Sequence, residues 1–182
     1  KYLDSYIGNK IIEQSIQSFL EKNKIQQTST KTFIEELKRN TSKNIDWFTE
    51  DYLGTRGNID FKITKVKASK DSIKVTIKNK HQNNMPISLF SLIEDSIASK
   101  VWIDGVSAKE TFTIANNKAT KLSLNYDQII PEYNLRDNWK SLKGFLSNNK
   151  PIQFRVFKDI EDPNYSQVFL MPLIEFNNIY DG

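Results

Sequence analysis

The apolar residues of this 182-residue chain change their spacing once, near residue 57, and this change constrains the fold more than any other feature. Before it, apolar side chains recur at intervals of three and four residues, which is typical of amphipathic helices. After it, they mostly alternate with polar side chains, which is typical of strands with one buried face. The sequence therefore predicts a helical segment over 1–57 and a β-sandwich over 58–182.

Three short helices are predicted in the first region. The first follows Asn9, a residue type that caps helices, and the second begins near Ser29 or Thr30. The third begins at Asn44 and ends at Gly54, since glycine is a common left-handed terminator. Helices of this size are too small for a core of their own, so their apolar faces need a partner, either the sandwich or another domain. The residues expected to face inward are Ile12, Ile16, Phe19 and Leu20, then Phe33, Ile34 and Leu37, then Trp47, Phe48 and Tyr52 or Leu53.

The second region alternates in short runs separated by polar turns. Ile73, Val75 and Ile77 alternate with lysine and threonine, so one face is predicted to be buried and the other solvated. Ile59, Phe61 and Ile63 alternate in the same way, with Asp60 on the polar side. Later strands are predicted at 87–92, 100–103, 110–114, 122–124, 152–157 and 167–171. The predicted class is α+β: a helical segment followed by an antiparallel β-sandwich, Ig-like or fibronectin-like, of about seven or eight strands.

The alternation fails between residues 126 and 150. This crossover contains the segment 130–134 (IPEYN) and a candidate short helix over 136–145, with Trp139 and Leu142 on its inner face. A crossover of about 25 residues is long for a sandwich, so it is expected either to be functional or to cap one open end.

The amino-acid composition excludes several kinds of catalytic and metal site. The chain has no cysteine and one histidine, His81, which lies in a turn-like run and is expected to be an exposed loop residue. No thiolate site, zincin motif or serine–histidine triad can therefore be assembled from this chain, and we expect it to be non-catalytic alone and to hold no cofactor. The net charge of +4 is spread without long runs of one sign, so no nucleic-acid partner is expected, and no apolar run is long enough to span a membrane.

The acidic run 159–164 (DIEDPN) is a candidate calcium site. Asp159, Glu161 and Asp162 offer the hard oxygen ligands that Ca²⁺ prefers. The spacing is not that of an EF-hand, and the alternative is an Asp-Pro turn whose carboxylates face water.

The crossover offers a candidate binding site for a glycan or a protein. Glu132, Tyr133, Arg136 and Trp139 combine charged and aromatic groups within eight residues. The alternatives are structural: Arg136 and Asp137 beside Glu132 would form an ion pair at the end of the sandwich, and the aromatic rings would belong to the core.

Several of these stretches resemble the M1 (gluzincin) family of zinc aminopeptidases. In the helical region they match segments downstream of that family's zinc site, with Thr32 standing where the family usually has Asp. The stretches are 2–8 (YLDSYIG), 29–37 (STKTFIEEL), 45–53 (IDWFTEDYL) and 58–61 (NIDF). Further on, 124–127 (LNYD), 130–139 (IPEYNLRDNW) and 180–182 (YDG) are similar to stretches in large M1-like metallopeptidases of Bacteroidetes-type bacteria.

The resemblance implies a C-terminal accessory fragment. The family's H-E-x-x-H motif and distant Glu have no counterpart here, so zinc is implied only in a parent protein. Residues 1–57 would then close a peptidase catalytic domain, and 58–182 would form a β-sandwich accessory domain beside it. The implied partner is the missing catalytic domain of the same polypeptide, and in some such proteins an outer-membrane segment follows. The implied location is the bacterial periplasm or cell envelope. A free-standing β-sandwich that binds a glycan or a protein is the alternative.

Overall fold

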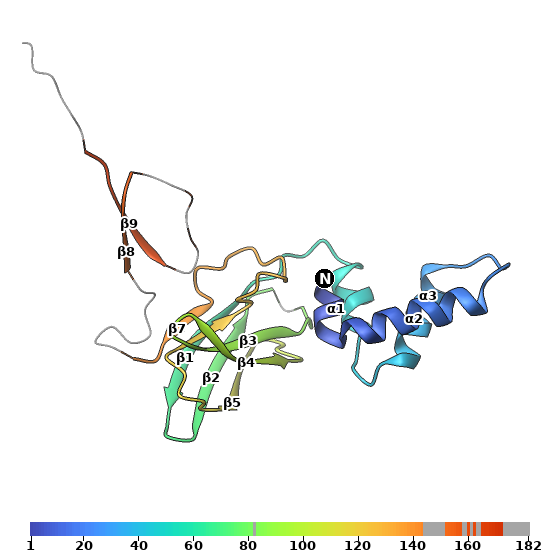
Figure 1. Ribbon diagram of the computed structural model, residues 1–182, viewed down its shortest axis with the longest axis horizontal. Coiled ribbons are helices and arrows are strands. Elements are labelled where there is room, and N and C mark those ends of the chain that lie inside the picture. Colours follow the sequence, from blue (N-terminus) through green and yellow to red (C-terminus); the bar gives the residue numbers. More distant parts are fainter. Residues whose placement is uncertain (82, 144–151, 158–159, 161, 163–164, 173–182) are drawn as a thin grey trace, which may run out of the picture.

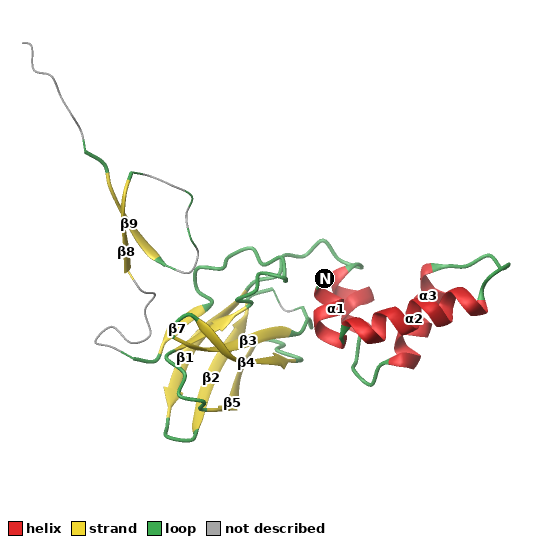
Figure 2. Ribbon diagram, in the orientation of Figure 1, coloured by secondary structure: helices red, strands yellow, loops and turns green. Residues whose placement is uncertain are grey.

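The computed structural model describes residues 1–81, 83–143, 152–157, 160, 162 and 165–172. Helices gather at the N-terminal end, two sheets pack against each other beside them, and a small third sheet stands apart (Figures 1 and 2). The predicted class, helices followed by an antiparallel sandwich, is confirmed.

The helical region has one more helix than the sequence predicts. The helices are α1 (Tyr2–Ile7), α2 (Asn9–Lys22), α3 (Thr30–Asn40) and a single π-helical turn, η1 (Phe48–Tyr52). Gly8 joins α1 to α2 with a φ of 101°, a conformation that disfavours any residue with a Cβ. Gly8 rather than Asn9 is therefore the N-cap of α2.

The caps of the later helices follow the sequence more closely. Ser29 caps α3 by accepting a hydrogen bond from the backbone N–H of Thr32. Asn44 accepts one from Asp46 at 2.7 Å, where the third helical stretch begins. Gly54 follows the third helical stretch, but it does not have the left-handed φ that the sequence predicted. Glycine is needed there because a Cβ would collide with the carbonyl oxygens of Thr49 and Glu50.

Two antiparallel sheets form the sandwich. The first has the order β1-β2-β5, and the second has the order β4-β3-β6-β7. The pair β8–β9, by contrast, is parallel. The strands are β1 (Phe61–Ala68), β2 (Ser72–Asn79), β3 (Ile87–Ile93), β4 (Ser96–Ile103), β5 (Lys109–Ala115), β6 (Lys121–Leu124), β7 (Trp139–Ser141), β8 (Ile152–Val156) and β9 (Ser166–Leu170).

The helix predicted over 136–145 does not form in the part that the structure describes. Residues 139–141 are strand β7 and pair with β6 instead. The reason is tertiary: Trp139 packs with Phe90 and Leu92 in a second apolar cluster, and the edge of β6 offers backbone partners. Pairing and burial outweigh the local helical spacing.

One apolar core runs through both regions. Tyr2, Tyr6 and Trp47 from the helical region lie in the same cluster as Ile73 and Leu89 from the two sheets. Rings make the connection, with 4.7 Å between the ring centroids of Tyr2 and Trp47. The sandwich is therefore the partner of α1 and the segment around Trp47, whereas α3 packs mainly on α2.

The outer face of α2 is different. Ile16 and Leu20, predicted to face inward, are 42% and 59% exposed. The helix contacts α3 instead, through the edge-to-face rings of Phe19 and Phe33 and through Glu36. Because only part of the apolar stripe meets α3, the remainder lies at the surface.

Candidate functional site

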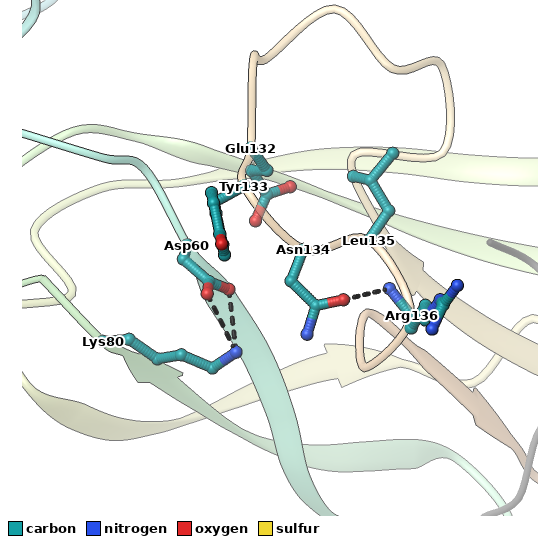
Figure 3. Close-up of a pocket in the computed structure, with 7 residues that line it drawn as sticks. All are labelled: Asp60, Lys80, Glu132, Tyr133, Asn134, Leu135 and Arg136. Atoms are coloured by element: carbon teal, nitrogen blue, oxygen red, sulfur yellow. Dashed lines mark hydrogen bonds and ion pairs between the residues drawn. The ribbon is translucent and has the colours of Figure 1, made fainter.

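Three segments meet at the end of the sandwich where the crossover returns to the sheet. Asp60 precedes β1, Lys80 follows β2, and residues 132–136 belong to the crossover between β6 and β7. Together they line an open hollow of about 930 Å³, called here the crossover pocket (Figure 3). Its lining residues are Asp60, Lys80, Glu132, Tyr133, Asn134, Leu135 and Arg136.

Backbone hydrogen bonds hold the crossover against the start of β1. Ile59 and Glu132 form a parallel bridge, and the N–H of Tyr133 donates to the carbonyl of Ile59 at 2.8 Å. Further along, the N–H of Ile63 donates to the carbonyl of Asp137 at 3.3 Å. The pocket wall is thus fixed by main-chain contacts on both sides of residues 134–136.

The side chain of Glu132 also holds the crossover against the start of β1. One carboxylate oxygen accepts from the N–H of Phe61 at 3.0 Å and the other accepts from the side-chain amide of Asn138 at 2.8 Å. Burial raises the pKa of Glu132 to about 7, and nearby Asp60 adds to the rise, against the lowering effect of these hydrogen bonds. A carboxyl with a pKa near neutrality can act as a general base. Both of its oxygens are already engaged by the protein, however, so the geometry favours a positioning role.

A lysine bridges two carboxylates at the pocket's rim. Lys80 Nζ lies 2.9 Å from Asp60 Oδ1 and 2.8 Å from Asp137 Oδ2. Asp60 itself is buried, which corrects the prediction that it lies on the solvated side of the first strand. The cation makes this burial tolerable, since a buried carboxylate needs a partner. The pair raises the pKa of Lys80, although burial opposes the rise.

The structure brings three of the four crossover candidates together. Glu132, Tyr133 and Arg136 line the pocket, and the ring of Tyr133 is 78% exposed. Trp139 lies elsewhere: it is 6% exposed and packs against Tyr126, with 5.6 Å between ring centroids. Asp137, for which an ion pair within the crossover was one alternative, forms an ion pair with Lys80, which follows β2.

Sequence reasoning missed Asp60 and Lys80 as pocket residues. They are 20 positions apart, and nothing in their local pattern marks them. Their meeting follows from the antiparallel pairing of β1 with β2, which places the start of one strand beside the end of the other. An acidic residue before one hairpin strand and a lysine after the other was the only available signal.

The candidate calcium ligands cannot be assembled from what the structure describes. Asp159 and Glu161 lie outside the described residues, and the N–H of Asp162 donates to the side chain of Gln167 at 2.8 Å. Among the described residues, no group of three or more His, Cys, Asp or Glu is placed to hold a metal ion. His81 is exposed in the loop after β2, as predicted. No helix in the described part of the chain is long and apolar enough to cross a membrane.

Comparison with known proteins adds a fold relationship. No protein-family model matches the chain, and neither does any curated protein sequence. Among solved structures, the crystal structure of Legionella pneumophila aminopeptidase A in complex with aspartic acid is similar, with a TM-score of 0.59 and 16% sequence identity. The match covers 72% of this chain but only 16% of that one. At this identity the likeness shows a shared fold, and the chain corresponds to a small part of that aminopeptidase.

Proposed function

We propose that this chain is a non-catalytic, C-terminal accessory part of an M1-type zinc aminopeptidase. The supporting comparison is the fold shared with a small part of an aminopeptidase. The observation that carries the proposal is that the helical region is only partly covered. Side chains of α1 and Trp47 are buried in the core shared with the sandwich, whereas Ile16 and Leu20 of α2 are exposed. An accessory element that joins two domains needs one face for each neighbour.

In this proposal the outer face of α2 packs against the catalytic domain of the same polypeptide. That domain would hold the zinc ion, since zinc sites require convergent His, Glu or Cys ligands. The sandwich would then brace the catalytic domain and shape access to it. We place the parent protein in the bacterial periplasm or cell envelope, with an outer-membrane segment as a further partner, on the strength of the sequence resemblance described above.

The first experiment is an activity assay. The chain is incubated with amino-acid p-nitroanilides and with short peptides, with and without added zinc. We expect no hydrolysis above the blank. Turnover that survives repurification, and that is lost on Glu132→Gln, would reject the non-catalytic part of the proposal and make Glu132 the general base.

The second experiment tests the α2 face. The double substitution Ile16→Ser and Leu20→Ser should change the unfolding free energy of the isolated chain by less than about 0.5 kcal/mol, because both side chains are already exposed. In a polypeptide that includes the catalytic domain, the same change should loosen the domain contact and increase proteolysis between the two parts. Ile25→Ser, at a side chain that is 97% exposed beyond the end of α2, is the matched control. Equal behaviour of the two variants in the longer polypeptide would reject the docking face.

The crossover pocket supports a second candidate, a free-standing module that binds a glycan or a protein. The observation in its favour is the exposed ring of Tyr133 beside the charged groups Lys80 and Arg136. Aromatic faces flanked by polar groups suit sugar rings. Glycan-array binding that is lost on Tyr133→Ala, with an unchanged melting temperature, would favour this candidate over the first. Trp139→Ala is the wrong probe, because removing a buried ring would unfold the sheet.

A further inference from the structure

The outer face of the first sheet, β1-β2-β5, carries many lysines. Ile73, Val75 and Ile77 of β2 are fully buried and define the core side of this sheet. Lys74 and Lys78 alternate with them, so they lie on the outer side. Residues that lie opposite each other on paired strands point to the same side, which extends this outer side to β1 and β5. It is called here the lysine face and belongs to one layer of the sandwich (Figure 1).

Strand pairing brings lysines from three strands into rows. Lys78 of β2 lies opposite Lys62 of β1 and Lys109 of β5. Lys74 lies opposite Lys67 of β1 in a second row. A sixth lysine lies between the rows, so the lysine face consists of Lys62, Lys65, Lys67, Lys74, Lys78 and Lys109. Five of these side chains are exposed, and that of Lys62 is half-buried.

No carboxylate in these strands shares the lysine face. The strands β1, β2 and β5 are described along their whole length, and Glu110 is their single acidic residue. Glu110 lies opposite Ile77, on the core side, and accepts from the hydroxyl of Ser107 at 3.2 Å. Asp71 lies in the turn beyond the ends of β1 and β2. Among the described residues, none of the six lysines forms an ion pair.

This arrangement of charge works against the stability of the sheet. Like charges directly opposite each other on adjacent strands repel. A surface that serves only solubility mixes both signs, as α2 and α3 do where Lys22 pairs with Glu36. Lysine stands opposite lysine in two rows of the sheet, so a negatively charged partner explains the face better than solubility does.

The side chains between the lysines are small and uncharged. The aromatic residues of these strands, Phe61 and Phe112, lie on the core side, so the face offers no ring for a base or a sugar to stack on. It also has no arginine, whose planar fork reads base edges. The remaining outward side chains at paired positions are Ser72, Thr76, Thr111, Thr113 and Ala115.

The shape of the face favours a phospholipid surface among negatively charged partners. Long lysine side chains stand above small ones on a broad sheet, so their ammonium groups can reach a plane of phosphates together. A DNA duplex is convex and would meet the same face along one line. Lysine also suits phosphates that move laterally, because its ammonium is a flexible point charge without a fixed direction.

We propose that the lysine face binds the surface of a bilayer that contains anionic phospholipids. The six ammonium groups lie against the lipid phosphates, and the sandwich rests on the headgroups without inserting. Each lysine close to such a surface strengthens binding by about fivefold, so six of them act together as one site. This inference goes beyond the accessory role proposed above and does not depend on a peptidase parent.

Cosedimentation with vesicles measures this binding. The whole chain is mixed at low ionic strength with vesicles made of equal parts phosphatidylglycerol and phosphatidylcholine. Vesicles of phosphatidylcholine alone are the control. We expect saturable binding to the anionic vesicles, none to the neutral vesicles, and a loss of binding as salt is added, because salt screens exposed charges.

A pair of lysine substitutions tests the face itself. Lys74→Gln combined with Lys78→Gln should weaken binding to the anionic vesicles by about tenfold or more. The matched control is Lys10→Gln combined with Lys24→Gln, which removes the same charge from exposed positions in the helical region. This control should weaken binding by less than about twofold, since its lysines lie outside the face.

Lys78→Glu separates binding from stability. A glutamate between Lys62 and Lys109 replaces two repulsions with two attractions, so the melting temperature should not fall. Vesicle binding should nevertheless weaken more than it does with Lys78→Gln.

Four results would overturn the proposal. They are no binding to the anionic vesicles, equal binding to the neutral ones, an equal loss in the control pair, or full binding by Lys78→Glu. Tighter binding to a DNA duplex than to the anionic vesicles would assign the face to nucleic acid and would also overturn it.

Discussion

Two carboxylates in different regions of this protein, Glu36 in the helical region and Glu132 in the sandwich, have opposite electrostatic environments. Glu36, on α3, accepts hydrogen bonds from Lys22 at 2.7 Å and Ser18 at 2.6 Å and is also approached by Arg39, and these partners lower its pKa to about 2. Glu132, at the sandwich end, accepts from a backbone N–H and an amide, and burial raises its pKa to about 7.

The two pKa values differ because only Glu36 has positively charged side chains as neighbours. Lysine and arginine side chains on α2 and α3 reach Glu36 from the solvent, so the charged form is stabilised. Glu132 meets only neutral donors, with the negative Asp60 nearby, so its charged form is disfavoured. Charged side chains thus add to the ring contacts between α2 and α3, whereas α1 is held on the sandwich mainly by apolar packing.

The largest effect should come from the packed side. Tyr2→Ala removes a ring that packs between Trp47 and Trp102 and whose hydroxyl donates to the carbonyl of Pro86. We expect a loss of about 3–5 kcal/mol in the free energy of unfolding, measured by urea titration followed by circular dichroism. Leu20→Ala on the outer face of α2 should cost less than about 0.5 kcal/mol. Equal losses in the two variants would break the comparison.

The next effect concerns the pH dependence of Glu132. Its pKa rises from 4.5 to about 7 on folding, so between these values the folded protein holds a proton that the unfolded chain has released. The stabilising contribution is complete below about pH 4.5 and is lost as the pH rises to 7, at a cost of about 3 kcal/mol.

Glu132→Gln should remove this dependence. Above pH 7 the variant should be more stable than the unaltered protein, because no charge is buried. If the Asn138 amide turns, the new amide can also donate to Asn138 Oδ1, which is buried without a partner among the described residues. Urea titrations across the pH range, with Glu21→Gln as the charge-matched control, provide the measurement. A variant that is less stable at every pH would show that the carboxylate is needed as an anion.

The smallest effect concerns Glu36, where the sign is reversed. Its pKa is lowered from 4.5 to about 2, so its contribution is present above pH 4.5 and is lost as the pH falls through 2. Glu36→Gln should flatten the loss of α2–α3 protection from hydrogen exchange over this acid range. Glu35→Gln, one residue earlier and exposed, should not. High salt should weaken the same contacts while leaving the packed side unchanged.

The sequence was informative where a local pattern and burial agree. The alternation of Ile73, Val75 and Ile77 predicted a strand with one buried face, and all three residues are fully buried in β2. Ser29 was predicted to begin the second helix, and it caps α3. The sequence-based prediction was wrong at Trp139, because residues 139–141 pair with β6 as a strand although their spacing is helical. It also failed at Ile16 and Leu20, because periodicity identifies an apolar face without naming what covers it.

The candidate sites were accessible only in part. Glu132, Tyr133 and Arg136 are neighbours in the chain, so a short window of sequence was enough to group them. Asp60 and Lys80 join them only because β1 and β2 pair antiparallel.

The residue inventory and the local spacings by themselves determined the class of fold, the order of its two regions, and the lack of any thiol or second imidazole. The tertiary structure alone decided which apolar faces are covered, which carboxylate is charged and which residues share a cavity. The physical reason is that periodicity and composition are properties of neighbouring residues, whereas burial and electrostatic partners depend on contacts between residues far apart in the chain.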